Sequence, residues 1–242
     1  MLSLTARRLA QSAVGCRTVG PTPRDPTAKY DFVPAEARDK GEIMDVTLKT
    51  LFAIEPHTRA LGITAENGSE FIDWLVSKSL KYPHSMRIVH KESGKVRFPL
   101  FTCQYLRKIS DDSDDVDLSQ AGEGVQILGL LLRAYSRCQI LDTLDVQVLR
   151  RELTFVDAAH QRQGIAQYLV HLGLDFDELR SRCLDGIVSE ASSIANQTLL
   201  AKNGYEELAR SKRKEYVRSN GEPVVFPDAT ETIKLFYLNL KQ

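Results

Sequence analysis

The residues with the clearest chemical signature form a short polar turn, Gln161–Ala166, with the sequence Gln-Arg-Gln-Gly-Ile-Ala. An apolar segment, Leu153–Val156, precedes it, and the apolar residues that follow are spaced as in a helix. Gly164 and Ala166 are small, so another group can approach the backbone closely. The first amides of a helix have no partner within it and lie at the positive end of its dipole. This pattern predicts an anion site that fits a pyrophosphate, although the same small residues also suit a turn that only permits close packing.

The polar turn is expected to lie within an alternation of strands and helices. Short apolar or alternating runs predict strands at Tyr30–Pro34, Met86–Val89, Val96–Tyr105, Val146–Val156, Gly186–Ala191 and Thr232–Leu240. Helical spacing of apolar residues predicts helices at Asp39–Phe52, Ser69–Lys81, Val125–Arg137, Gly164–Leu174 and Ile194–Lys202. Ser69 is the expected cap of the second helix, and Pro56 should end the first. The alternation predicts an α/β fold in which helices cover both faces of a mixed sheet.

The overall composition narrows the possible classes of protein. The chain has 242 residues, with 32 Lys and Arg against 32 Asp and Glu. This length suits one large domain or two small ones, and the balanced charge argues against a protein that coats nucleic acid or an anionic membrane. Apolar runs such as Ile127–Leu132 are far shorter than the roughly 20 residues of a membrane span. The four cysteines form no CxxC pair, so we expect no metal site and ordinary reduced thiols.

Residues 1–24 differ in composition from the rest of the chain. They contain four arginines and no acidic residue, among hydroxyl and apolar side chains. This composition is typical of a mitochondrial transit peptide, although it also suits a basic N-terminal segment without a targeting role. Loss of these four of the 32 basic residues would leave a net charge of −4. We expect a transit peptide at 1–24, a proline-containing linker at 25–29 and one domain at 30–242, located in the mitochondrial matrix or alternatively in the cytoplasm.

Two blocks of the chain resemble signature segments of the GCN5-related N-acetyltransferases (GNATs). Gln161–Ala166 matches the pattern Gln/Arg-x-x-Gly-x-Gly/Ala, after an expected strand and at the start of a helix. Residues 186–205 resemble the next strand and helix of the family, closed by Lys202-Asn203-Gly204-Tyr205. Phe52-Ala53-Ile54-Glu55-Pro56, followed by Ala60-Leu61-Gly62, is similar to the arylalkylamine N-acetyltransferase-like proteins of invertebrates. The resemblance implies the GNAT fold over 30–242, with a mixed, mostly antiparallel central sheet that splays at the cofactor cleft.

The resemblance also implies how acetyl-CoA, the co-substrate of the family, would bind. The backbone of Phe155 and Val156 would pair with the pantetheine arm, and Asn196 would bond this arm or act as a local cap. The amides of the turn would hold the pyrophosphate, and the residues concerned are Gln161, Arg162, Gln163, Gly164, Ile165 and Ala166. This binding mode involves no metal ion.

Two residues carry the implied chemistry, in which a primary amine attacks the thioester directly. The amine is mostly protonated at neutral pH, so a group must accept its proton. The resemblance assigns this role to Glu55, whose alternative is an exposed helix-end residue. The tyrosine that serves as acid in many GNATs would fall at Leu200, which has no proton to give. Ser192 matches a serine linked to this step in the arylalkylamine branch, with helix capping as its alternative, and His57 could join a proton path.

Four other features have weaker signals. His160 precedes the turn and could contact a phosphate or lie exposed, and Trp74 could border an amine pocket or pack in the core. The acidic run Asp111–Asp117 could attract a cationic amine or be a solvated loop. Lys212–Lys214 could meet the 3′-phosphate of CoA or solvate a loop.

These features predict an acetyl-CoA-dependent N-acetyltransferase that acts on a small primary amine: an arylalkylamine, another biogenic amine or a polyamine. Two alternatives stay open, a protein lysine acetyltransferase with an open groove and a non-catalytic acyl-CoA-binding GNAT-like protein. Leu200 favours the last of these and Glu55 argues against it. A pocket enclosed by Phe52, the second helix and the 106–123 loop would favour a small amine. We expect a monomer or homodimer, with no nucleic-acid partner and no membrane insertion.

Overall fold

The structure is a computed structural model, and it describes residues 25–82, 84–101, 103–106, 117–136, 147–170, 175–211, 215–226, 229 and 232–241. Only the backbone is described for 96–101, 103–106 and 133–136. The expected transit peptide at 1–24 lies outside the described residues, as do Lys212–Lys214 and all but the last residue of the acidic run at 111–117.

Helices and strands alternate along the described chain, as the sequence predicts. The strands are β1 (Tyr30–Pro34), β2 (Met86–His90), β3 (Val96–Phe101), β4 (Cys103–Leu106), β5 (Val148–Arg151), β6 (Gly186–Ala191), β7 (Glu206–Arg210) and β8 (Lys234–Asn239). The α-helices are α1 (Lys40–Ile54), α2 (Pro56–Ala60), α3 (Ala65–Ser79), α4 (Glu123–Ser136), α6 (Ile165–Leu169), α7 (Phe176–Ser181) and α8 (Ile194–Lys202). Short 3₁₀ helices lie at Pro26–Ala28, within the expected linker, and at Ala37–Asp39 and Ala158–His160. In the part of the chain that is described, no helix has both the length and the apolar character needed to cross a membrane.

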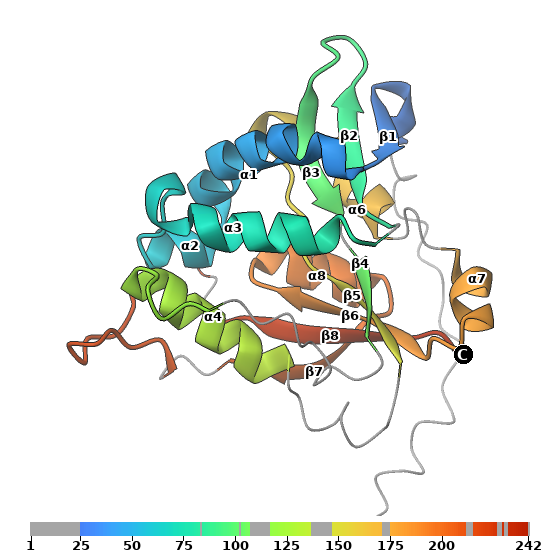
Figure 1. Ribbon diagram of the computed structural model, residues 1–242. Helices are drawn as coiled ribbons and strands as arrows, with labels where there is room; N and C mark the ends of the chain where they lie inside the picture. Colours follow the sequence, from blue (N-terminus) through green and yellow to red (C-terminus); the bar gives the residue numbers. More distant parts are fainter. Residues whose placement is uncertain are drawn as a thin grey trace, which may run out of the picture.

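The strands form two sheets, and the chain passes from the first to the second between β3 and β4 (Figure 1). The first sheet has the order β1-β2-β3 and is antiparallel throughout. The second has the order β4-β5-β6-β8-β7 and is antiparallel except for the β5–β6 pair. The mixed, mostly antiparallel α/β arrangement is therefore confirmed. The single strand expected at 96–105 is wrong, because β3 and β4 belong to different sheets.

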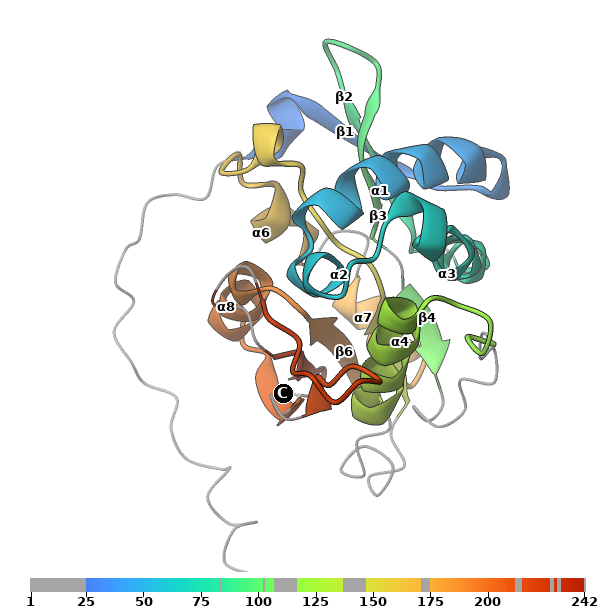
Figure 2. The same ribbon diagram turned by 90° about the vertical axis from the view of Figure 1, so that its left-hand side faces the viewer.

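Helices lie on both sides of the second sheet (Figure 2). Successive side chains of a strand point to opposite faces, so Leu149 and Ile187 face α6 and α8, and Val148 and Val188 face the other way. The first face forms a core with Ile165, Leu169 and Leu200 of those helices. A separate core joins α1, α3 and α4 through residues that include Ile43, Ile72 and Leu128. On the other side of the second sheet α4 contacts β8, so this sheet lies between the α6–α8 layer and α4.

Several element boundaries differ from the prediction for local reasons. Helix α3 begins at Ala65, because Thr64 and Asn67 cap each other reciprocally, with Thr64 N donating to Asn67 Oδ1 at 2.8 Å. Ser69 therefore lies inside the helix, and its expected capping role is wrong. Helix α6 ends at Leu169, and α7 and β7 were not expected from the sequence pattern.

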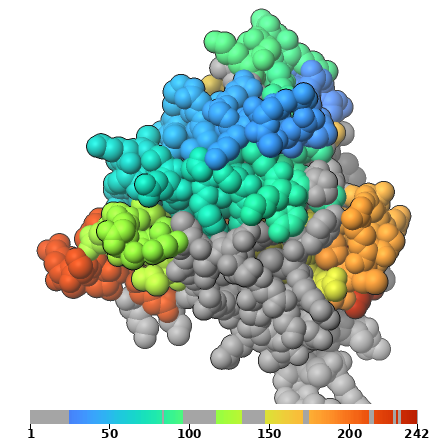
Figure 3. Space-filling view, viewed as in Figure 1, coloured from blue at the N-terminus to red at the C-terminus, as the bar shows by residue number. Residues whose placement is uncertain are grey.

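Residues 215–226 form a hairpin that connects distant parts of the fold, with Val217 bridged to Pro223. Arg218 Nη2 donates to Ala60 O at 3.1 Å, at the end of α2. Ser219 N donates to Glu123 Oε1 at 2.6 Å, at the start of α4. The space-filling view shows this 215–226 hairpin beside α4 at one edge of the molecule (Figure 3). The hairpin was not expected from the sequence, and it brings its own side chains close to α2.

Candidate active site

A cleft opens where β5 and β6 stop pairing. The strands run parallel from Val148 opposite Gly186 to Arg151 opposite Ser189, and residues 152–157 then belong to no strand. Strand β6 continues beside β8 as far as Ala191. A cleft of about 740 Å³ lies at this divergence, lined mainly from residues 151–156, 160–167 and 189–196 and from the end of α1. A strand without a partner offers backbone groups to an extended ligand, so this splay suits the arm of a cofactor.

The 161–166 turn brings main-chain amides to the edge of the cleft. Arg162 and Gly164 have φ angles of 61° and 86°, which turn the chain into α6 at Ile165. Gly164 adopts this left-handed conformation without steric cost, whereas an L side chain such as that of Arg162 is strained there. The Gln161 side chain donates from Nε2 to Val156 O at 3.2 Å and ties the turn to the segment before it. Amides that follow one another in such conformations form a concavity that binds anions.

All but one of the residues expected to bind the cofactor line this cleft: Phe155, Val156, Gln161, Arg162, Gly164, Ile165, Ala166 and Asn196. Gln163 is the exception, and its Oε1 accepts from Lys29 Nζ at 3.5 Å. The side chains of Phe155 and Ile165 are buried in the two cores.

Glu55 occupies the break between α1 and α2. The residue before a proline is driven out of the helical conformation, and Glu55 accordingly has φ −76° and ψ 123° while Pro56 begins α2. Its Oε2 accepts from Thr58 N at 2.6 Å, and Thr58 Oγ1 donates to its carbonyl oxygen at 2.9 Å. The side chain is 14% exposed and lines the cleft. The interpretation of Glu55 as an exposed helix-end residue is therefore wrong.

The carboxylate of Glu55 is kept ionised by its neighbours. Burial raises the pKa of Glu55, because a surrounding of low dielectric disfavours the charged form. His57, the Thr58 amide and the Ser192 hydroxyl oppose this and together outweigh it, so the pKa of Glu55 lies below that of an ordinary glutamate. His57 Nδ1 lies 3.4 Å from Glu55 Oε1, which makes this an electrostatic contact and not a conventional hydrogen bond. The site thus holds a base that is unprotonated at neutral pH.

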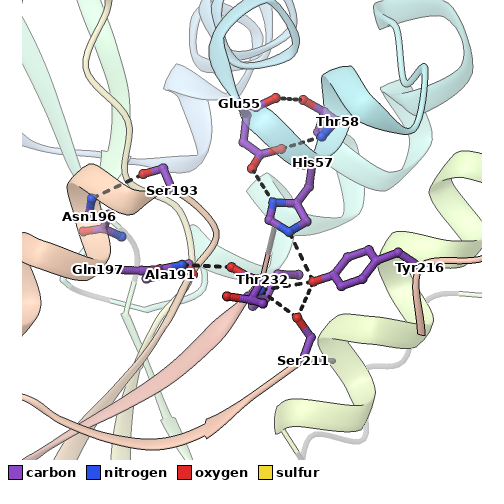
Figure 4. Close-up of polar contacts among 11 residues, drawn as sticks. Glu55, His57, Thr58, Ala191, Ser193, Asn196, Gln197, Ser211, Tyr216 and Thr232 are labelled. Atoms are coloured by element: carbon purple, nitrogen blue, oxygen red, sulfur yellow. Dashed lines mark hydrogen bonds and ion pairs between the residues drawn. The ribbon is translucent and has the colours of Figure 1, made fainter. Parts of the chain in front are cut away.

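The two serines at the end of β6 have separate roles. Ser193 is the N-cap of α8, and its Oγ accepts from Asn196 N at 3.3 Å (Figure 4). Both serines line the cleft, but capping belongs to Ser193, and the Ser192 hydroxyl is the one that lowers the pKa of Glu55. Leu200, at the position of the usual tyrosine, is fully buried in the core of the second sheet and α8.

Two polar clusters at the cleft are not predicted by the sequence, or are predicted only weakly. The hydroxyl of Tyr30 and His160 Nδ1 are 2.6 Å apart, so the residue before the turn is tied to β1 instead of lying exposed. Arg150 joins two buried carboxylates at the point of divergence, with Glu152 at 3.3 Å and Glu190 at 3.1 Å. Arg150 and Glu152 lie close together in the sequence, but only the β5–β6 register reveals that Glu190 is beside them.

Other candidates lie away from the cleft. Trp74 stacks on Phe71 and lies under the Lys78 ammonium, and it does not line the cleft. Phe52 packs in the α1–α3 core beside Gly68. Within the described residues, no group of three or more His, Cys, Asp or Glu side chains is arranged to hold a metal ion.

Comparison with known proteins identifies the class of fold. No family model matches the sequence, and no curated protein matches it either. Among solved structures, arylalkylamine N-acetyltransferase 2 from Aedes aegypti superposes with a TM-score of 0.72 at 17% identity, over 87% of this chain and 99% of that one. The polyamine N-acetyltransferase of Drosophila melanogaster, described as forming N-acetylagmatine, gives 0.65 at 14% identity, over 87% and 99%. The chain therefore has the GNAT fold, and the fold expected from the two sequence blocks is confirmed.

The same fold also supports other reactions. The C-terminal condensation domain of Ebony, solved with β-alanyl-dopamine, superposes with a TM-score of 0.64 at 16% identity, over 87% of this chain and 99% of that domain. The fold alone therefore does not specify a reaction, and the function has to be argued from the side chains of the cleft.

Proposed function

We propose that this protein is an acetyl-CoA-dependent N-acetyltransferase for a small primary amine. One observation carries the proposal: Glu55, a mostly buried carboxylate with a lowered pKa, lines the same cleft as the 161–166 turn. A cleft that only stored acyl-CoA would not need an ionised carboxylate held inside it, because burying a charge is costly. The supporting argument is therefore chemical and rests on this base.

The reaction follows from these groups. The turn would bind the pyrophosphate, and residues 153–156 would pair with the pantetheine arm, so that the thioester points toward Glu55. The substrate ammonium gives one proton to Glu55, and the free amine then attacks the carbonyl carbon. The N–C bond forms and the C–S bond breaks, while the second proton passes from nitrogen to the departing thiolate. The proton on Glu55 returns to solvent after the products leave.

Ser192 is the group we propose for the transfer to the thiolate. Leu200 has no proton and is buried, so the tyrosine route of many GNATs is absent. Ser192 lines the cleft, and its hydroxyl lowers the pKa of Glu55. A hydroxyl can donate its proton to sulfur and regain one from nitrogen, which leaves the serine unchanged after each turnover.

The cleft lining favours a small substrate with an apolar body. The lining includes Leu51, Ile54, Pro56, Leu153 and Leu199, and Glu55 would receive the amine end. An arylalkylamine or another biogenic amine fits this best, and a polyamine is the second choice within the class. Phe52 and the expected second helix, α3, do not line the cleft, and the expected wall formed by the 106–123 loop lies largely outside the described residues. A peptide lysine therefore remains an outcome of the experiment below. The mitochondrial location likewise stays a prediction that rests on residues 1–24.

The test is CoA release from acetyl-CoA by the full chain, with a panel of phenethylamines, diamines and a lysine peptide. We expect turnover with one small-amine class, and a kcat lower by about 10²-fold or more in Glu55→Gln, because general bases contribute roughly 10²–10⁴-fold. The dissociation constant for acetyl-CoA should stay unchanged, since the turn is intact.

Glu42→Gln is the matched control, because Glu42 lies on α1 at an exposed ion pair with Arg87, outside the cleft. This variant should keep full activity. Tight acetyl-CoA binding without turnover on any small amine would contradict the proposal. Turnover on the peptide alone would move the assignment to a protein lysine acetyltransferase.

A further inference from the structure

A buried histidine connects Glu55 to the 215–226 hairpin. His57 is fully buried, with Nδ1 facing Glu55 Oε1 at 3.4 Å and Nε2 facing the Tyr216 hydroxyl at 3.2 Å. Figure 4 shows the imidazole between the carboxylate and the phenol, with Ser211 beyond. The ring is also packed edge-on against Phe226, at 5.0 Å between ring centroids. Both nitrogens of His57 thus have a fixed polar neighbour.

Beyond His57, the hydroxyls of Tyr216 and Ser211 are held by hydrogen bonds from the main chain. Tyr216 is fully buried, and its oxygen accepts from Ile233 N at 3.1 Å and contacts Ser211 Oγ. Ser211 Oγ also accepts from Ile233 N, at 2.8 Å. Burial raises the pKa of Tyr216, so its hydroxyl keeps a proton to donate at neutral pH.

For a neutral His57 ring, the hydrogens of the contact series from His57 to Ser211 can be ordered in two directions, and one is favoured. If Ser211 donates to Tyr216 and Tyr216 donates to His57 Nε2, then Nδ1 carries a hydrogen that points toward the Glu55 carboxylate. In the reverse order, the bare Nδ1 would face the negative oxygen inside the protein, with no hydrogen between them. Two buried acceptors in contact are unfavourable, because neither is compensated for its lost water. The first order is therefore the one that fits an ionised Glu55.

We propose that Ser211, Tyr216 and His57 form a directed hydrogen-bond series that fixes the His57 tautomer and holds the Glu55 carboxylate ionised and in position. His57 is then a positioning residue, because it acts through Glu55 and does not line the cleft. The inference deepens the proposed function and rests on it for its kinetic part. It explains how a mostly buried carboxylate remains a base.

The groups that face Glu55 are few in the described structure. They are His57 and Thr58 from α2 and Ser192 from the end of β6, with Tyr216 acting beyond His57 and Glu215 acting on Tyr216. His57 lowers the pKa of Glu55 and burial raises it. If His57 is removed, less opposes the effect of burial, and the pKa of Glu55 would rise. Since Glu55 must be ionised to accept a proton, activity would then be lost at a higher pH than in the wild type.

The experiment compares His57→Leu, His57→Asn and Tyr216→Phe with the wild type in the full chain. In His57→Leu we expect the acidic limb of the pH profile of kcat/KM to move to higher pH, by about one pH unit or more. Below the new limb, kcat/KM should be lower than in the wild type by about tenfold for each pH unit of this shift. Activity should recover at higher pH, where Glu55 loses its proton. The amine substrate ionises equally in both assays, so its contribution drops out of the ratio of kcat/KM between the variant and the wild type.

The other variants distinguish the effect of the hydrogen bonds of His57 from the effect of its packing. His57→Asn should restore much of the wild-type limb, because the introduced side chain would present an amide hydrogen near the place of Nδ1. Tyr216→Phe should give a smaller upward shift than His57→Leu. Phe226→Leu disturbs the packing of His57 without removing a hydrogen bond, and it should lower stability without moving the limb. An unmoved limb in a folded His57→Leu protein that still binds acetyl-CoA would overturn the inference.

A second measurement decides the inference without turnover. Carbon-13 NMR of the glutamate carboxyl groups, with Glu55 assigned by the signal lost in Glu55→Gln, gives its titration directly. We expect the Glu55 signal to titrate at higher pH in His57→Leu than in the wild type. An unchanged titration would overturn the inference even in an active enzyme. A shifted titration in a protein that acetylates no amine would support the inference while contradicting the proposed function.

Discussion

The two walls of the cleft are built from different parts of the chain and by different means. The turn wall consists of residues 153–167, and it offers main-chain amides in a conformation set by Gly164. The α2 wall consists of Glu55, α2 and the 215–226 hairpin behind them, and it offers side chains. Main-chain binding depends on backbone geometry, whereas the α2 wall depends on the identity and order of its polar atoms. Side-chain substitutions should therefore affect the two walls very differently.

The largest expected effect lies where β5 and β6 diverge, at the start of the turn wall. Arg150 holds Glu152, where the turn wall begins, and Glu190, which leads to Ser192, and all three side chains are about 10% exposed. Replacing Arg150 by Met would leave two buried carboxylates without this cation, so we expect a loss of about 3–5 kcal/mol in the free energy of unfolding. Urea denaturation measures it.

Arg182→Met is the control for this variant, because Arg182, the C-cap of α7, forms an ion pair with Glu178 of this helix, and both side chains are about half-exposed. Exposed pairs of this kind contribute about 0.5 kcal/mol or less. Equal losses in the two variants would contradict the view that Arg150 supports the divergence of β5 and β6.

The next effect tests the turn wall. Gly164→Ala places a side chain at φ 86°, which costs about 1–2 kcal/mol, and this strain would distort the amides. We expect about tenfold weaker acetyl-CoA binding by calorimetric titration. Gln163→Ala is the matched control, because Gln163 does not line the cleft, and its affinity should stay within about twofold of the wild type. A stronger effect at Gln163 would mean that the turn binds through side chains after all.

The smallest effects separate the adjacent serines. Ser193→Ala removes the cap of α8 and should cost about 1 kcal/mol of stability, with kcat unchanged. Ser192→Ala should leave the melting temperature unchanged and lower kcat about fivefold near neutral pH. Water can replace the hydroxyl as the proton donor, so the loss is about that of a single hydrogen bond, about 1 kcal/mol. The variant should also move the acidic limb upward, because the Ser192 hydroxyl lowers the pKa of Glu55. The same kinetic loss in both variants would contradict their separate roles.

The sequence predicted the turn wall well and the α2 wall only in part. Gly164, Ala166 and the turn–helix context are local, so the placement of this turn at the edge of the cleft followed from adjacent residues. The strand expected up to Val156 ends at Arg151, and the binding of a cofactor here stays a prediction. Gln163 is the one residue of the turn that does not line the cleft, and the turn pattern does not reveal which side chains point away. The role of its main-chain amide stays a prediction. Glu55 and Ser192 were found by resemblance, and the geometry that brings them together was not readable from their spacing.

Tyr216 and Ser211 could not be predicted as neighbours of the site. Tyr216 reaches His57 through the 215–226 hairpin, whose position depends on Arg218 and Ser219 contacting α2 and α4. Ser211 directly follows β7 and is held by the main chain of Ile233. Such contacts join residues far apart in the sequence, and no periodicity records them. The division of 96–105 into β3 and β4 was hidden for a similar reason, since both strands form one continuous run of strand-like residues.

The parallel pairing of β5 with β6 has a consequence for the lifetime of the protein. The cleft exists only when this pair has formed and α6 is docked on it, so the unfolded chain has no comparable site. A ligand that binds the native state alone adds RT ln(1 + [L]/Kd) to its stability, about 2.7 kcal/mol when its concentration is 100 times Kd. If acetyl-CoA is that ligand, the fraction of folded protein, and with it the resistance to proteolysis, would rise and fall with the acetyl-CoA supply of its compartment.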